Sequence, residues 1–283
     1  MTFRRKIPLF FPLIALLGSC SVSIPRAQTP APTEPPAPVA PPVTPPKTAI
    51  PAVTPKISPP TLSPSPKHPL KVRSASLNST AFTAVTFDRR DFFLKVIDQK
   101  GGPGSQFDNA EAAGKGSLAT INGSFFNPDG SPLGLVIAGG ESRGAFNSSS
   151  FLGSGILDGK ALTLATRKTY QKSSELLQAG PRLVWDGKVV TGLSTNNDRP
   201  RSFVIWDGAD HFGIAYADTA TLQGLSNNLR SQPLKGFNIK YALNLDGGTS
   251  CDLWISHSVP GGGIAKNSFF LKKARNYLAL RKR

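Results

Sequence analysis

The sequence predicts an α+β fold: mixed, strongly twisted β-sheets with a few short helices, in a single domain after a disordered tether. Many short segments alternate apolar and polar residues and end at glycine, proline or Asp-Gly, which is the pattern of strands joined by tight turns. Only three segments have the apolar spacing of a helix. Seventeen of the 26 prolines lie between residues 25 and 69 of the 283-residue chain. The first quarter therefore lacks the apolar content to bury a core.

The first 20 residues are typical of a secretory signal. Basic residues at positions 4–6 precede an apolar run over residues 7–17, which is too short to span a bilayer as a stable helix. Leu17-Gly18-Ser19-Cys20 resembles the lipobox of bacterial lipoproteins, which implies that Cys20 is lipidated and becomes the mature N-terminus. We therefore expect secretion across the inner membrane and lipid anchoring in the bacterial cell envelope, periplasmic or surface. An ordinary cleaved signal is the alternative.

Residues 21–71 are predicted to be a proline-rich tether, and residues 72–283 one globular domain. The formal charge of the chain is +16, of which residues 1–73 contribute +8 and residues 272–283 contribute +6. This placement favours an anionic membrane or envelope surface, since nucleic-acid sites also interleave aromatic residues with the cations. The expected partners therefore include a membrane, through the lipid anchor, and no nucleic acid.

In the first half of the domain, strands are expected wherever a short apolar run lies between polar corners or turn residues. They cover residues 81–87, 92–97, 118–121, 134–138, 151–157 and 161–165. The last two are expected to pair across Asp158-Gly159, a dipeptide that favours a tight hairpin. Residues 106–113 and 170–177 have helical spacing.

In the second half, the same pattern predicts strands over residues 183–185, 202–206, 212–217, 241–245, 252–256, 269–271 and 276–280. Gly180-Pro181 lies directly before the first of these, where proline is tolerated. Asp207-Gly208 predicts a hairpin. A helix capped by Asp218 or Thr219 is expected to run to about Leu229.

Asp246 stands at the end of the apolar 241–245 run and is followed by Gly247 and Gly248. Paired glycines let the backbone adopt positive φ and let another molecule come close to the main chain. This arrangement would present a carboxylate at the mouth of a sheet. The alternative is an ordinary Asp-Gly hairpin between two core strands.

An amide and two arginines stand at other strand ends. Asn122 closes the 118–121 run, where it either faces a site or satisfies its own turn. Arg201 begins a strand, a position suited to bidentate binding of phosphate or carboxylate; a surface ion pair with Asp198 is the alternative. Arg182 begins another strand and, taken by itself, is typical of a solvated surface cation.

Cys251 is the one cysteine left after Cys20, so no structural disulfide is expected. A cysteine beside apolar residues is usually a small buried hydrophobe, and a nucleophilic Cys251 paired with His257 is the alternative. A metal site could include Asp246 or Asp129, but no segment has the ligand spacing that would support one. Neither a metal nor another cofactor is therefore expected.

Four short segments follow one another in a characteristic order: Asn122-Gly123-Ser124-Phe125-Phe126, Gly180-Pro181-Arg182-Leu183, Arg199-Pro200-Arg201-Ser202 and Asn244-Leu245-Asp246-Gly247-Gly248-Thr249-Ser250. This order and spacing resembles the phosphodiester glycosidase family over about residues 118–270. The resemblance implies a pocket faced by Asn122, Arg201 and Asp246. It further implies walls and substrate contacts from Gly180, Gly247, Gly248, Arg182, Ser250 and Phe125. Family members commonly have glycine at the position of Thr249, whose added side chain could narrow the pocket.

The resemblance also implies hydrolysis of a sugar 1-phosphodiester at its glycosidic C–O bond, in envelope glycan metabolism, with a glycan or sugar phosphate as substrate. Asp246 would be the nucleophile or general base, Arg201 the phosphate clamp, and Asn122 an orienter of sugar or water. His257 would be a candidate proton shuttle. Two alternatives are a non-catalytic carbohydrate-binding or scaffold lipoprotein of the envelope and a transferase that remodels polysaccharide.

Overall fold

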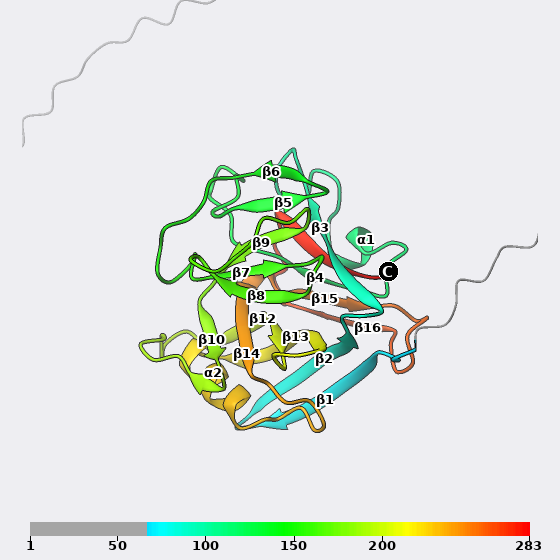
Figure 1. Ribbon diagram of the computed structural model, residues 1–283, viewed down its shortest axis with the longest axis vertical. Helices are drawn as coiled ribbons and strands as arrows, with labels where there is room; N and C mark the ends of the chain where they lie inside the picture. The colour runs from blue at the N-terminus through cyan, green and yellow to red at the C-terminus, as the bar shows by residue number, and fades with distance from the viewer. Residues whose placement is uncertain (1–66) are drawn as a thin grey trace, which may run out of the picture. The chain divides into compact units, whose positions relative to one another are not determined.

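The computed structural model describes residues 67–283, which form three β-sheets with two short α-helices and one 3₁₀ turn (Figure 1). Cys20, the signal and most of the predicted tether lie outside the described residues. Every strand pair in the described part is antiparallel. The expectation of mixed sheets is therefore wrong. Parallel neighbours need a crossover of about a dozen residues or more, usually a helix, and the helices here span four and nine residues.

The sheets have seven, five and five strands. The seven-stranded sheet has the order β1 (Lys71–Leu77), β2 (Thr80–Asp88), β13 (His211–Ala220), β12 (Arg199–Trp206), β14 (Tyr241–Gly247), β10 (Arg182–Trp185) and β11 (Lys188–Val189). The second has β16 (Ile264–Asn267), β15 (Asp252–Ile255), β4 (Ala119–Asn122), β17 (Asn276–Lys282) and β3 (Phe92–Asp98). The third, green in Figure 1, has β6 (Glu141–Arg143), β5 (Val136–Ala138), β9 (Leu176–Ala179), β7 (Gly155–Asp158) and β8 (Thr163–Thr166).

The main hydrophobic core draws apolar side chains from all three sheets. Val85 of β2, Leu94 of β3 and Leu177 of β9 are among its fully buried members, one from each sheet. A second core lies on the opposite face of the seven-stranded sheet, where α2 (Leu222–Arg230) packs. Successive residues of a strand point to opposite faces, so Leu243 of β14 packs in the first core and Ala242 in the second. Packing on both faces holds β14 in place, together with the strand end that carries Asp246.

The hairpins predicted at Asp158-Gly159 and Asp207-Gly208 are confirmed, since they join β7 to β8 and β12 to β13. The helix expected over residues 170–177 is wrong. Leu176 and Leu177 enter two different hydrophobic clusters from opposite faces of β9, which adjacent residues do in a strand. The strand expected over residues 269–271 is also wrong, because these residues form an exposed loop.

The two helices are shorter than their sequence patterns suggest. α1 (Ala110–Ala113) starts after Asn109, whose side chain accepts a hydrogen bond from the Ala112 amide. α2 starts after Thr221, whose hydroxyl accepts one from the Gly224 amide; both are ordinary N-caps. Within residues 67–283, no helix is long and apolar enough to cross a membrane.

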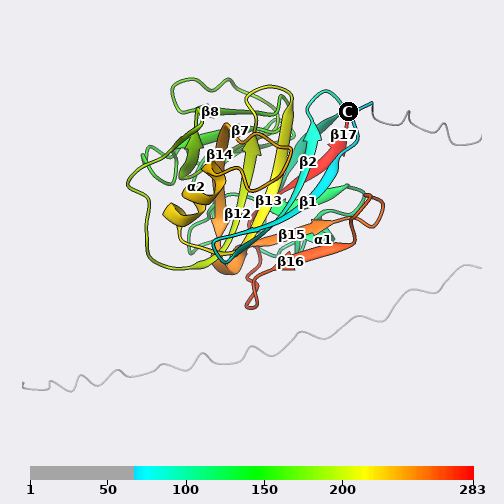
Figure 2. The same cartoon turned by 90° about the horizontal axis from the view of Figure 1, so that it is seen from below.

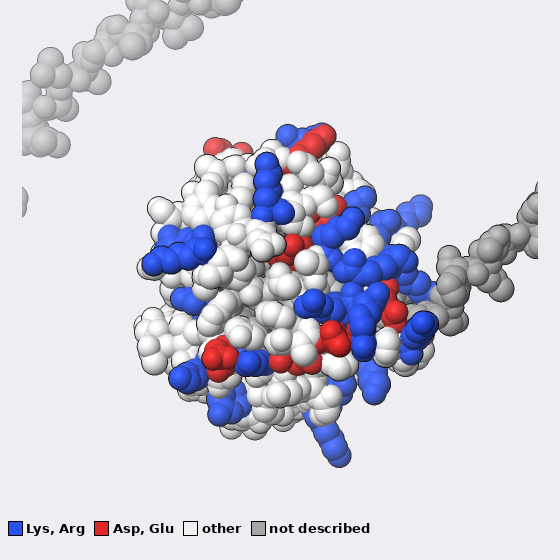
Figure 3. Space-filling view, viewed as in Figure 1, with Lys and Arg blue, Asp and Glu red and all other residues white. Residues whose placement is uncertain are grey.

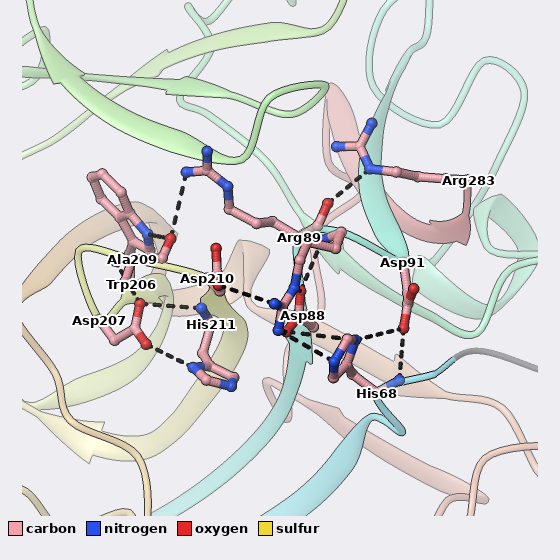
Figure 4. A network of polar contacts seen from close by, with 11 residues as sticks. His68, Asp88, Arg89, Asp91, Trp206, Asp207, Ala209, Asp210, His211 and Arg283 are labelled. Atoms are coloured by element: carbon pink, nitrogen blue, oxygen red, sulfur yellow. Dashed lines mark hydrogen bonds and ion pairs between the residues drawn. The ribbon is translucent and has the colours of Figure 1, made fainter.

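The beginning of the described chain and its C-terminus are fixed to the same corner of the domain (Figure 4). The His68 amide donates to the Asp91 carboxylate at 2.7 Å, and the Arg283 amide donates to the Asp91 carbonyl at 2.9 Å. The Arg283 guanidinium also donates to the Arg89 carbonyl at 2.8 Å. Basic side chains gather around this end of β17 (Figure 3).

Candidate functional site

β14 ends at Asp246 and Gly247, and the chain then leaves its sheet instead of turning back. Gly248 has a φ of +65°, a left-handed conformation that favours glycine, and begins the 3₁₀ turn of residues 248–250. The next strand, β15, belongs to a different sheet. The Asp-Gly hairpin alternative is therefore wrong, and the partly exposed Asp246 stands where the chain crosses between two sheets.

Asn122 is fully buried beside this crossing, and both the nitrogen and the oxygen of its side-chain amide form hydrogen bonds. Its Nδ2 donates to the Asp246 main-chain carbonyl at 2.8 Å. Its Oδ1 accepts from the Ser202 hydroxyl at 2.5 Å and from the Asp252 amide at 3.0 Å. The Asp246 amide in turn donates to the Gly123 carbonyl at 2.9 Å. These bonds connect β4, which carries Asn122, to β12, β14 and β15. Asn122 is 0% exposed, so its side-chain amide does not face solvent.

Gly123 allows a second buried amide to approach this crossing. A Cβ on Gly123 would overlap the side chain of Asn276. The Asn276 Oδ1 accepts from the Ser124 amide at 2.8 Å, and the Gly123 amide donates to the Asn276 carbonyl at 2.8 Å. Sequence reasoning missed Asn276 because it lies in an apolar run on a distant strand; nothing local signals its role.

Two arginines of β12 lie against the glycines that follow Asp246. Arg201 is buried, and its guanidinium donates from Nε to the Ala220 carbonyl and from Nη2 to the Asn197 carbonyl, each at 2.9 Å. A Cβ built on Gly247 would lie 3.4 Å from the Arg201 Nη1, and one on Gly248 would lie 3.6 Å from the Arg199 Nη1.

The Nη1 atoms of the two arginines differ from the other guanidinium nitrogens of Arg201 in their bonding. Among residues 67–283, neither has a protein acceptor, and no carboxylate lies within 4.0 Å of Arg201, so the proposed ion pair with Asp198 is not formed. Sequence reasoning missed Arg199. The signal was its place in the same Arg-Pro-Arg motif as Arg201.

Burial is the largest cause of the pKa shifts of both Asp246 and Arg201. Burial raises the pKa of the Asp246 carboxyl to about 6, against the lowering effects of the Ser250 hydroxyl, the Gly247 amide and the Arg199 charge. Burial and the neighbouring Arg199 lower the pKa of Arg201 to about 10. At neutral pH, Asp246 is therefore mainly ionised and close to its midpoint, and Arg201 is charged.

The residues of the Gly180-Pro181-Arg182 segment are divided by the structure. Gly180 contacts the site strand directly, since its carbonyl accepts from the Asn244 Nδ2 at 3.0 Å; a Cβ there would overlap the Phe151 carbonyl. Arg182 instead stacks over the Trp185 ring, 5.0 Å from its centroid. That ring packs on Tyr241 at the opposite end of β14 from Asp246, so the Arg182 guanidinium is directed away from the carboxyl.

Three other predicted residues have different placements. Ser250 is buried next to Asp246, and its hydroxyl lowers the pKa of the Asp246 carboxyl. Phe125 is partly exposed just past β4, and its carbonyl accepts from the Leu133 amide at 3.0 Å. His257 is exposed beyond the far end of β15 and packs on Gly263, about five residues of extended chain, roughly 15 Å, from Asp252. The structure does not bring His257 to Asp246.

Cys251 is a buried structural side chain. It is 0% exposed, its Sγ lies 3.7 Å from the Asp246 carbonyl, and burial raises the pKa of its thiol to about 12. A protonated thiol is a poor nucleophile, and His257 is not beside it. The Cys251–His257 alternative is therefore not supported.

A cavity of about 460 Å³ lies away from this crossing, at the opposite ends of the same strands. Its lining includes His68, Lys71, Arg73, Asp88 and His211, and part of it appears in Figure 4. Within residues 67–283, no group of three or more His, Cys, Asp or Glu side chains could hold a metal ion.

We place the candidate site at Asp246 because three of the four signature segments meet there by direct contacts and the fourth through Gly180.

Comparisons with known proteins agree with this fold. The catalytic domain of zebrafish N-acetylglucosamine-1-phosphodiester alpha-N-acetylglucosaminidase, auto-inhibited by its pro-peptide, matches with a TM-score of 0.53 and 15% identity over 79% of this chain and 85% of that one. A hypothetical protein from Synechocystis matches with a TM-score of 0.52 and 14% identity over 78% and 64% of the two chains. At these identities, the likeness concerns the fold alone.

No curated protein sequence matches the chain. The sequence profile of the phosphodiester glycosidase family matches residues 115–279, which is more than half of the chain and contains all four signature segments. The protein therefore belongs to the phosphodiester glycosidase family.

Proposed function

We propose that this protein hydrolyses a sugar 1-phosphodiester by breaking the bond between the anomeric carbon and the phosphate oxygen. Water adds a hydroxyl to the sugar, and a phosphate monoester leaves. The observation that carries the proposal is the meeting of one titratable carboxyl, Asp246, with two arginines, Arg199 and Arg201, beside Gly247 and Gly248. Family membership supplies the reaction class.

A phosphate leaving group changes what the site must provide. Ordinary glycosidases need a protonated carboxyl to help an alcohol leave, together with a second carboxylate. A phosphate monoester leaves as a stabilised anion, so fixed cations can take the place of the acid. Arg201 suits this task because two main-chain carbonyls hold its guanidinium, and its Nη1 has no protein acceptor among residues 67–283. Arg199 adds a second, more exposed cation.

Asp246 is the proposed nucleophile or general base. Its pKa of about 6 leaves the carboxylate ionised at neutral pH while keeping it basic enough to accept a proton. Its place is fixed by the alternation of β14, by the Asn122 side chain, which donates to its carbonyl, and by the Gly123 carbonyl, which accepts from its amide. Asn122 is thus a positioning residue in this proposal, and His257 has no role in it.

Isotope labelling tests the reaction class. The full-length protein would be incubated in H₂¹⁸O with methyl phosphodiesters of glucose, galactose and N-acetylglucosamine 1-phosphate. We expect ¹⁸O in the anomeric hydroxyl of the released sugar and none in the phosphate monoester. Label in the phosphate would identify P–O cleavage and overturn the proposal. Binding without turnover would indicate the carbohydrate-binding alternative, and transfer of the sugar to a sugar acceptor the transferase.

The predicted location supports a substrate of the cell envelope. Cys20 and the apolar run before it resemble a lipoprotein signal, so we propose that the domain acts outside the inner membrane on envelope glycans. Mass spectrometry of the mature N-terminus after expression in a bacterium tests this part separately. A lipid-modified Cys20 is expected, and an unmodified N-terminus downstream of residue 20 would contradict it.

A further inference from the structure

The most exposed apolar side chains of the described domain are two adjacent phenylalanines. Phe269 is 91% exposed and Phe270 is 74% exposed, whereas the other exposed large hydrophobics, Phe146 and Phe151, are 43% and 37% exposed. The Phe269 and Phe270 rings touch only edge to face, with centroids 4.8 Å apart. Since phenylalanine is a residue of protein interiors, a pair left almost wholly in water suggests a surface that is covered by a partner.

The loop that carries this pair is firmly attached at both sides. It connects β16 to β17 and extends beyond the body of the domain below β16 in Figure 2. On one side, the Ser268 amide donates to the Cys251 carbonyl at 3.1 Å; on the other, the Lys272 amide donates to the Thr249 carbonyl at 2.7 Å. The rings are therefore presented by a fixed loop, and its stems bond to the segment that follows Asp246.

Three lysines lie within four residues of the two rings in the sequence. Lys266, Lys272 and Lys273 are exposed. Lys273 pairs with Asp108 at 2.7 Å, whereas among residues 67–283 Lys266 and Lys272 have no carboxylate within ion-pair distance. The sequence Phe269-Phe270-Leu271-Lys272-Lys273 thus places an apolar tip directly beside positive charge, the combination that binds the interface of anionic bilayers.

We propose that the loop of residues 268–273 inserts into the surface of an anionic lipid bilayer. The two rings would enter the boundary between headgroups and acyl chains, and Lys266 and Lys272 would face the lipid phosphates. A sugar platform fits less well, because the ring planes stand at 88° to each other and offer no continuous flat face. A bilayer accommodates apolar groups in any orientation.

Site-specific labelling tests the proposal independently of catalysis. The full-length protein would carry Cys20→Ser and Phe270→Cys, with the fluorophore NBD attached at position 270; Cys251 is 0% exposed and should not react. The matched control carries the label through Phe151→Cys. Both share the same N-terminal segment, so any binding through that segment is equal in the two proteins.

With vesicles of phosphatidylglycerol and phosphatidylcholine, we expect NBD emission at position 270 to shift to the blue and rise at least twofold, with little change at 151. Phe269→Ser in the labelled protein, or vesicles of phosphatidylcholine alone, should reduce the rise at least threefold. Equal responses at 270 and 151, or full quenching at 270 by aqueous iodide in the presence of vesicles, would overturn the proposal. An equal response to neutral vesicles would overturn the role of the lysines.

Discussion

Asp246 and Asp252 lie six residues apart, and burial raises the pKa of both carboxyls to about 6. Their surroundings differ. Asp252 is 4% exposed and accepts a hydrogen bond from the Ala110 amide at 2.6 Å, with Glu111 as its charged neighbour. Asp246 is partly exposed and lies beside Arg199. A raised pKa thus marks burial in both, and only Asp246, a partly exposed residue beside a cation, is placed to react.

The largest effect should come from exchanging each carboxyl for an amide. Asp246→Asn removes the proposed nucleophile or base, so we expect kcat on a sugar 1-phosphodiester to fall by about 10⁴-fold. Asp252→Asn retains an oxygen for the Ala110 amide and should lower kcat by less than about tenfold. Steady-state assays with circular dichroism as the folding check would decide. Comparable losses in both variants, with both folded, would abolish the distinction.

Substitution of the arginines should also lower activity according to their distance from the proposed site. Arg201→Lys cannot keep both carbonyl bonds and also offer a donor to phosphate, and we expect kcat/KM to fall by about 10²-fold. Arg199→Lys, at an exposed position, should cost about tenfold. Arg182→Lys is the matched control with less than a threefold change, because its guanidinium stacks on Trp185. A larger loss for Arg182→Lys than for Arg201→Lys would contradict the placement of the site.

Stability should not distinguish the two carboxyls. A native pKa of about 6, above the ordinary 3.8, means that the native state holds the proton more tightly than the unfolded state. Ionisation therefore costs stability, and the cost appears as pH rises from about 4 to about 6. Asp246→Asn and Asp252→Asn should each raise the free energy of unfolding by about 2 to 3 kcal/mol at pH 8, and by little at pH 3.5. Urea unfolding at both pH values measures this.

Such a result would show that the proposed active carboxyl is retained at a cost in stability. If Asp252→Asn raised the free energy of unfolding at pH 8 and Asp246→Asn did not, burial would not be the cause of the raised pKa of Asp246. The comparison would then rest on the arginines alone.

Turn chemistry and strand patterns made much of this fold predictable, but they act over short distances. Asp207-Gly208 specifies its hairpin locally, because the loop of residues 207–210 between β12 and β13 needs a positive φ, and Gly208 adopts one of +83°. Asp246-Gly247 carries the same local signal, yet the chain passes to another sheet, because Asn122 bonds the Asp246 carbonyl from a strand 124 residues away in sequence. A local pattern cannot contain that contact.

The signature segments indicated which parts of the chain belong to one site, but not which atoms remain free to act. Asn122 looks like a substrate-binding amide in the sequence, and its bonds to Ser202 and Asp252 occupy it. Arg199 is not singled out by the sequence, and it lies beside Gly248. The apolar run at Phe269 looks like a strand, and it carries the most exposed large apolar side chains of the described domain. In each case the outcome depends on which way the side chain points relative to strands that are distant in the sequence.

The smallest effect, and the one most specific to Asp246, is the shape of the pH profile. A nucleophile or base must be ionised, so kcat/KM should fall as pH drops through about 6, reaching about a tenfold loss at pH 5. Asp252→Asn should keep this acidic limb, since its carboxyl takes no part. Arg199→Gln removes a charge that lowers the Asp246 pKa, so it should move the limb to higher pH by a few tenths of a unit. A limb that disappears in Asp252→Asn, or moves to lower pH in Arg199→Gln, would assign the titration to a different group.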